Sequence, residues 1–284
     1  MPSLYATAFE LMMYGLLVLT ARHAWRTGGG WGLVRLLSGV VYGVVLEAAT
    51  IHQVAAYAYG RFWVMVTPEV PLAIGVGWGV IVYGVRLYTQ ALALPGWQRA
   101  VLNGLLALNI DLAMDVVAIR LGFWDWGQGL DFQYFGVPWG NFWAWFWVVW
   151  GFTLVWETGT WRGLGRWLQP WVALGFGLLV VLGTNALFVF YLRPRGWDTA
   201  AVAVELLVAL ALALRSGFWR RWRGCPHPLA AVVAGAFHGY FFLAGLLSGA
   251  LLKPPVLLLP ALLMLALAEV LYRRLPRAAC PADA

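Results

Sequence analysis

The sequence predicts an all-α bundle of about nine transmembrane helices. Of its 284 residues, 62% are hydrophobic and 11% carry charge, whereas a typical soluble domain is about 45–50% apolar and about 25% charged. So few polar residues cannot form the water-facing shell that a soluble core of this size requires, and the surrounding solvent is therefore expected to be lipid. Unbroken apolar runs such as 206–214 indicate helices, because the strands of a membrane barrel alternate between lipid-facing and lumen-facing residues.

The individual spans follow from length and punctuation. A spanning helix needs about 20 mostly apolar residues, and charged or turn-forming residues mark its ends. The expected spans are 4–21, 36–59, 70–92, 98–121, 138–158, 169–191, 198–215, 228–250 and 255–272. The first lacks a cationic start and a small-residue cleavage site, so we expect a retained helix and not a cleaved signal. The whole chain, 1–284, is expected to form a single integral membrane domain.

The basic residues predict the orientation of these spans. With the N-terminus outside, fourteen of the 19 Lys and Arg residues fall on the cytoplasmic side, five fall on the other side, and the C-terminus is cytoplasmic. This asymmetry is the one that the positive-inside rule describes. We therefore expect a multi-pass protein of the cell membrane whose partner is the lipid bilayer, and the sequence leaves its oligomeric state open.

The net charge and the cysteines argue against two other features, a nucleic-acid partner and a disulfide or redox motif. The net charge of +7 is explained by topology and forms no basic stripe, so no nucleic-acid partner is expected. The two cysteines, Cys225 and Cys280, fall on the expected cytoplasmic side and lack metal-ligand spacing. They predict neither a disulfide nor a redox motif.

Two acidic residues in the fourth expected span are the strongest candidates for chemistry. Ionisable groups inside a bilayer are costly, so each is a functional hypothesis by default. Asp111 and Asp115 lie four positions apart, which places both carboxyl groups on one helix face, about 6 Å from each other. In a low dielectric both cannot ionise comfortably, so one is expected to stay protonated and to donate a proton. The alternative is an interhelical hydrogen bond or an ion pair with an arginine such as Arg120.

A third acid, Glu47, lies near the centre of the second expected span, with His52 five residues on. Glu47 could bond a neighbouring helix, and a lone His is more often a packed polar group than a ligand. A di-metal carboxylate site requires Glu-x-x-His spacing on paired helices, and this motif is absent, so no metal is expected. The remaining acids near span ends are expected at the membrane interface or in helix packing; they are Glu10, Glu157, Glu205 and Glu269.

Aromatic residues are concentrated next to the acid pair. The segment from Trp124 and Trp126 to Trp145 is far denser in aromatic rings than a membrane-interface belt requires. Part of it is explained by such a belt and by helix packing, but the rings also suit a pocket wall that attracts cations. Asp125 and Asn141 could supply polar contacts at its mouth. Acids beside aromatic faces suit protonation of an alkene to a tertiary carbocation, and the substrate would be an isoprenoid lipid.

Several short motifs point to one family. They are the run YGRF at 59–62, Asp111 with Asp115, Trp124 with Trp126, and the run YFGVP at 134–138 followed by Asn141 and Trp145. In these motifs the chain resembles the carotenoid 1,2-hydratase family of integral membrane proteins. The resemblance covers roughly residues 40–150, whereas the helices expected at about 169–272 carry no matching motif.

The resemblance implies a hydro-lyase. Such an enzyme adds water to the terminal double bond of an acyclic carotenoid end group, gives a tertiary alcohol, and uses no cofactor. By matching positions, Asp111, Asp115 and Glu47 would be the acid–base residues. The expected substrate contacts are Asn141, which could hold the water, with Trp124, Trp126, Asp125, Trp145, Tyr59, Arg61 and His52.

The sequence leaves other functions open. A lycopene-type cyclase uses the same protonation, but an internal alkene captures the cation in place of water. A non-catalytic membrane protein that binds a carotenoid or a quinone would explain the tryptophans but not a buried acid pair. A transporter should show repeated broken helices in its two halves, and Pro254 and Pro255 have no counterpart of that kind.

Overall fold

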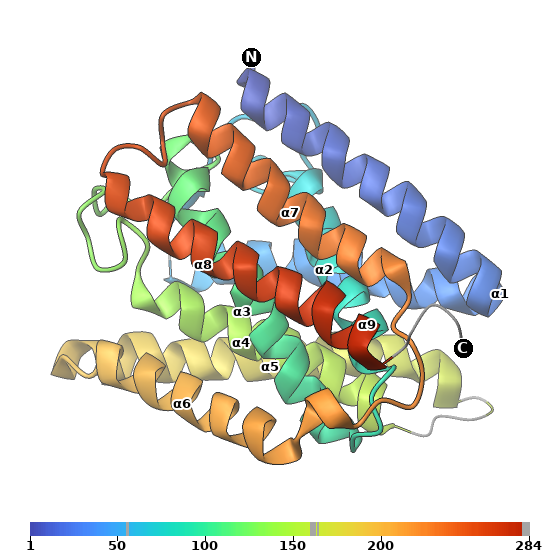
Figure 1. Ribbon diagram of the computed structural model, residues 1–284. Coiled ribbons are helices and arrows are strands. Elements are labelled where there is room, and N and C mark those ends of the chain that lie inside the picture. Colours follow the sequence, from blue (N-terminus) through green and yellow to red (C-terminus); the bar gives the residue numbers. More distant parts are fainter. Residues whose placement is uncertain (55–56, 160–162, 164, 280–284) are drawn as a thin grey trace. The chain divides into compact units, whose positions relative to one another are not determined.

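The computed structural model describes residues 1–54, 57–159, 163 and 165–279, and this part of the chain is mostly helical (Figure 1). The helices are α1 (Leu4–Val54), α2 (Leu72–Thr89), α3 (Gly96–Arg120), α4 (Trp139–Thr158), α5 (Gly165–Leu187), α6 (Asp198–Ser216), α7 (Pro228–Leu247), α8 (Leu258–Glu269) and α9 (Leu275–Ala279). Short π-helical turns follow α5 and α8. Two strands, β1 (Ala58–Tyr59) and β2 (Trp124–Asp125), form one small antiparallel pair.

These helices confirm the all-α membrane bundle. Within the described residues, seven helices are long and apolar enough to cross a membrane. The expected spans 4–21 and 36–59 both lie largely in α1, whose backbone leaves helical geometry at Gly29 (φ 56°, ψ −145°), a conformation that glycine adopts at little cost. The tryptophan-rich α4 is not among the seven. The number of nine crossings and the orientation of the termini stay predictions.

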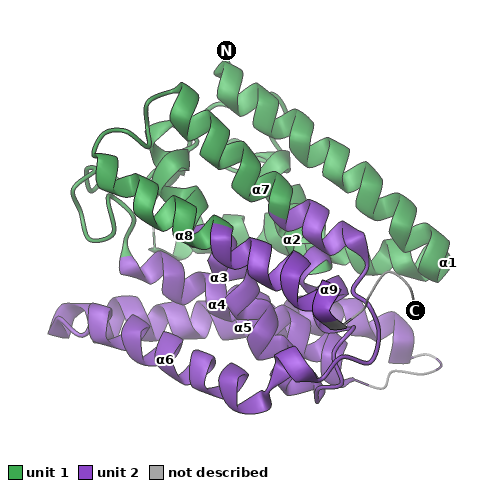
Figure 2. Cartoon of the chain, viewed as in Figure 1, with its two compact units in different colours: residues 1–83, 112–138, 235–265 green, residues 84–111, 139–234, 266–284 purple. Residues whose placement is uncertain are grey.

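By its internal packing the chain divides into two compact units (Figure 2). The first comprises residues 1–83, 112–138 and 235–265, and the second comprises 84–111, 139–234 and 266–284. The helices α2, α3, α7 and α8 contribute residues to both units. That the chain is a single membrane domain stays a prediction.

In the first unit, α1 and α2 pack closely through glycines. A Cβ atom at Gly39 would lie 3.2 Å from the Cα atom of Gly79, and one at Gly43 would lie 2.5 Å from the Cβ atom of Trp78. Small residues at such positions let helix backbones approach inside a membrane, where van der Waals packing drives association. The close approach carries the indole of Trp78 towards the second half of α1.

In the second unit, α4 packs along α5. The indole nitrogen of Trp143 donates a hydrogen bond to the carbonyl of Thr184 at 3.2 Å, and its ring lies 5.4 Å from the ring of Phe188. A Cβ atom at Gly151 would lie 3.2 Å from the side chain of Val180. Part of the aromatic cluster therefore serves helix packing.

One expectation about the loops is wrong. Cys225, which follows α6, is disulfide-bonded, whereas the sequence predicted no disulfide. Cys280 lies outside the described residues. The spacing of two distant cysteines gives no sign of their separation in space, and it is this separation that decides whether a disulfide forms.

Candidate active site

The centre of the candidate site in the first unit is the carboxyl group of Glu47. Glu47 lies in the second half of α1 and is only 6% exposed. One oxygen accepts a hydrogen bond from the Tyr57 hydroxyl at 2.5 Å, and the other accepts one from the indole nitrogen of Trp78 at 2.6 Å. The hydroxyl of Tyr59 also lies close enough to interact with this carboxyl group. Two hydrogen-bond donors therefore fix the orientation of the buried Glu47 carboxyl group.

The two tyrosines reach Glu47 because the chain is extended after α1. Residues two apart in an extended segment point to the same side, which sets Tyr57 and Tyr59 side by side. The segment is held by pairing with β2, in which Tyr59 lies opposite Trp124, and the Gly60 amide donates to the Phe123 carbonyl at 2.9 Å. A Cβ atom at Gly60 would lie 2.1 Å from the carbonyl oxygen of Gly122, so this approach requires glycine.

The same strand pair places two of the predicted tryptophans against the tyrosines. The ring of Trp126 lies 4.8 Å from that of Tyr57, and the ring of Trp124 meets that of Tyr59 edge-on at 5.9 Å. The sequence predicted Trp124 and Trp126 as pocket-wall residues. The structure brings both of them to the tyrosines that bind Glu47.

Asp115 belongs to the same cluster. It is buried on α3, with 1% exposure, and lies close enough to interact electrostatically with both tyrosine hydroxyls. Burial above all, together with the charges of Glu47 and Asp115, raises the pKa of Tyr57 and of Tyr59 well above the usual value. Both tyrosines lie in the loop after α1 and remain protonated hydrogen-bond donors at neutral pH.

The other member of the predicted acid pair, Asp111, is described in the second unit. It is fully buried, and its Oδ2 accepts a hydrogen bond from the Asn141 side chain at 2.9 Å. Asn141 was predicted to hold water, and it binds Asp111 directly from the first turn of α4. Trp145, one turn further along α4, is buried. That Asp111 and Asp115 share one proton stays a prediction.

Three predicted substrate contacts differ from the residues of this cluster because they are exposed. Asp125 is exposed and caps a turn, with its carboxylate accepting from the Gly127 amide at 2.8 Å. Arg61 is exposed after β1, and His52 is exposed in the last turn of α1. Among the residues that the structure describes, no group of three or more His, Cys, Asp and Glu side chains is arranged to hold a metal ion.

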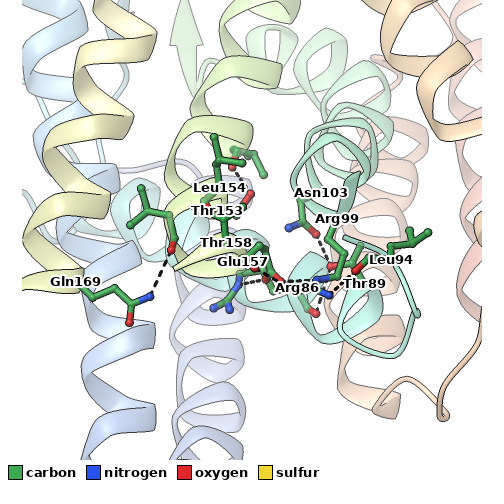
Figure 3. A network of polar contacts seen from close by, with 12 residues as sticks. Arg86, Thr89, Leu94, Arg99, Asn103, Thr153, Leu154, Glu157, Thr158 and Gln169 are labelled. Atoms are coloured by element: carbon green, nitrogen blue, oxygen red, sulfur yellow. Dashed lines mark hydrogen bonds and ion pairs between the residues drawn. The ribbon is translucent and has the colours of Figure 1, made fainter. Parts of the chain in front are cut away.

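Sequence reasoning missed a buried ionic network in the second unit (Figure 3). Glu157, expected near the interface or in packing, pairs with Arg86 at 2.7 Å and with Arg99 at 2.6 Å. Beside it, the Thr89 hydroxyl donates to the Asn103 side chain at 2.8 Å. The sequence does show two arginines and one glutamate near the ends of expected spans. Their separation along the chain, however, gives no indication that they form ion pairs.

The fold and this site define a class of protein. It is a helical membrane protein in which hydrogen-bond donors and aromatic rings surround a cluster of buried carboxyl groups. A family described as carotenoid biosynthesis protein matches residues 6–171, which is more than half of the chain. The chain therefore belongs to the carotenoid biosynthesis protein family and has a role in carotenoid biosynthesis. No curated protein and no solved structure matches it. The family match includes Glu47, Tyr57, Tyr59, Asp111 and Asp115 and extends beyond the resemblance noted over 40–150.

Proposed function

We propose that the protein adds water to the terminal carbon–carbon double bond of an acyclic carotenoid end group. The single observation that carries this proposal is the cluster of Glu47 and Asp115 around the hydroxyls of Tyr57 and Tyr59. It combines two buried acids with neutral donors, which suits a proton transfer at each end of the reaction. Membership of the family points to a carotenoid as the substrate. A carotenoid is apolar, so it is expected to reach the protein from the membrane.

In the proposed first step, Asp115 acts as the acid. Its carboxyl proton adds to one alkene carbon, the π electrons form the new C–H bond, and the other carbon becomes a tertiary cation. The faces of Trp124 and Trp126 can stabilise such a cation without forming a bond to it. Asp115 is the better candidate because it interacts with the tyrosines that bind Glu47, whereas Asp111 is hydrogen-bonded by Asn141.

In the second step, Glu47 acts as the base. A water oxygen attacks the tertiary carbon, and the proton that it loses passes to the Glu47 carboxylate. The hydroxyls of Tyr57 and Tyr59 interact with both acids, so they can return the proton from Glu47 to Asp115. One water molecule is consumed, a tertiary alcohol is formed, and no redox cofactor is needed.

The alternative is cyclisation, in which a neighbouring alkene captures the same cation. The tyrosine hydroxyls and Glu47 favour hydration, because they offer a water molecule both donors and an acceptor. A non-catalytic carotenoid-binding role explains the aromatic rings but leaves the cost of two buried acids without a purpose.

The test is expression of the full chain in a lycopene-accumulating host, followed by mass analysis of the extracted pigments. Hydration predicts products heavier by the mass of one or two water molecules. A product of unchanged mass but altered retention supports the cyclase. Unaltered lycopene beside a well-expressed, folded protein contradicts both enzymatic functions.

A further inference from the structure

The ionic network of the second unit forms where three helices begin or end. Arg86 lies in the last turn of α2, Arg99 in the first turn of α3, and Glu157 next to the last residue of α4. The helices approach closely here, since a Cβ atom at Gly96 would lie 2.3 Å from the Glu157 carbonyl oxygen. Figure 3 shows the Glu157 carboxylate between the two arginine side chains.

The guanidinium groups of the two arginines differ in the number of hydrogen bonds that they donate. Arg99 binds Glu157 through Nε, donates to the Leu94 carbonyl at 2.7 Å, and donates to the Glu157 carbonyl at 3.2 Å. Arg86 uses Nε for Glu157, and within the described chain its two terminal amino groups make no hydrogen bond. A guanidinium has five N–H donors, so Arg86 keeps four of them for another partner.

The network also carries a net positive charge. Two guanidinium groups face one carboxylate, which leaves one positive charge on side chains that are only 6% (Arg86) and 14% (Arg99) exposed. The ring of Trp156 lies 5.7 Å from the Arg86 guanidinium, but such a contact is weaker than the cost of a buried charge that no anion balances. An anion that binds the free fork of Arg86 would remove this cost.

We propose that Arg86, oriented by Glu157, binds the phosphate group of an anionic ligand at the membrane interface. The planar fork of arginine matches two phosphate oxygens, and basic pockets between transmembrane helices bind anionic lipid headgroups. Because the network lies at helix ends, a headgroup can reach it without entering the hydrocarbon core. The network belongs to the second unit and the Glu47 cluster to the first, and the proposal does not depend on the proposed function.

The experiment uses the full-length protein, purified in a zwitterionic detergent and stripped of lipid. The thermal unfolding midpoint is measured while short-chain phosphatidylglycerol, phosphatidylcholine with the same chains, inorganic phosphate, or potassium chloride at equal ionic strength is added. A ligand that binds the folded state raises the midpoint with its concentration. The comparison is between the wild type, Arg86→Gln, and the matched control Arg273→Gln, which removes an arginine that is 59% exposed.

We expect phosphatidylglycerol to raise the midpoint of the wild type and of Arg273→Gln, and phosphatidylcholine and chloride to leave both unchanged. For Arg86→Gln the Kd should rise at least about tenfold, as expected for the loss of charge-assisted hydrogen bonds. A response to inorganic phosphate as well identifies the phosphate itself as the ligand, and a response to the lipid alone identifies a headgroup.

Two results would overturn the proposal. One is a wild type that responds to neither phosphatidylglycerol nor inorganic phosphate beyond the chloride control. The other is an Arg86→Gln variant that binds as the wild type does. If Arg86→Gln does not fold, Arg86→Lys replaces it, because lysine keeps the charge and lacks the fork. Weaker phosphate binding by Arg86→Lys supports the proposal, and unchanged binding contradicts it.

Discussion

Glu47→Gln separates the chemical role of Glu47 from its structural role, because the two side chains have nearly the same shape. The amide oxygen of Gln can still accept from Trp78, whose indole nitrogen only donates. The amide nitrogen then faces Tyr57, whose hydroxyl can turn to accept a hydrogen bond. The hydrogen-bonded arrangement is therefore kept, and the negative charge is lost.

The expected magnitudes follow from these contacts. Two charge-assisted hydrogen bonds become neutral ones, and each change costs about 1 kcal/mol, so the free energy of unfolding should fall by about 2 kcal/mol. The loss of a general base should lower the rate of hydration by about 100-fold to 10,000-fold. Folding is thus affected mildly and turnover severely.

Glu10→Gln is the matched control. Glu10 is also a buried carboxyl on α1 in the first unit, and it accepts from the Trp63 and Val64 amides at 2.7 and 3.1 Å and from the Tyr14 hydroxyl at 3.1 Å. Its donors are backbone groups and a neighbouring side chain, so its role is structural. We expect a comparable loss of stability and unchanged turnover per folded molecule.

The assay combines the thermal unfolding midpoint of each purified variant with conversion of an acyclic carotenoid in liposomes. Turnover is expressed per folded molecule, so that stability and activity are separated. Hydration at the wild-type rate by Glu47→Gln would refute the role of Glu47 as the base. An equal loss of turnover in Glu10→Gln would show that the effect is structural.

Four further substitutions test other parts of the structure. Asp115→Asn should lower hydration of an acyclic carotenoid more than Asp111→Asn does, because Asp115 is the proposed acid and Asp111 is held by Asn141; full activity in Asp115→Asn would rule out that role. Glu205→Leu should raise the thermal unfolding midpoint, because both carboxyl oxygens of Glu205 are buried without a hydrogen-bond partner in the described chain. Burying such unpaired groups costs about 1–3 kcal/mol. A lower midpoint in this variant would contradict the account. Gly43→Ala should destabilise the first unit by about 1–3 kcal/mol and lower turnover, because the new Cβ atom would lie 2.5 Å from that of Trp78. Wild-type stability and turnover in Gly43→Ala would contradict the close contact.

The helices were predictable because membrane insertion imposes strong rules on composition. Span length and apolar runs locate segments such as 169–191, which overlaps α5. Helical geometry in α1 continues past Arg22 and Arg26 as far as the break at Gly29, which was not predictable, because charges usually mark the end of a span. The pairing of β1 with β2 was also hidden, since two-residue strands show no periodicity.

The candidate site was predictable where it depends on residue type and not where it depends on contacts. Glu47 and Asp115 stand out because charges are rare in this chain, and Trp126 stands out because aromatic residues are concentrated around it. The donors Tyr57 and Trp78 bind Glu47 across 10 and 31 positions. Such pairs depend on how segments pack, so a single sequence carries no local signal for them.

The central claim, that the protein adds water across a carotenoid double bond, is tested most directly with isotopically labelled water. The purified protein in liposomes that contain an acyclic carotenoid is incubated in water labelled with heavy oxygen, and the pigments are analysed by mass spectrometry. The account predicts a tertiary alcohol whose oxygen carries the label, with little label incorporated by Glu47→Gln. An unlabelled product, or a labelled alcohol formed equally well without the protein, would contradict it.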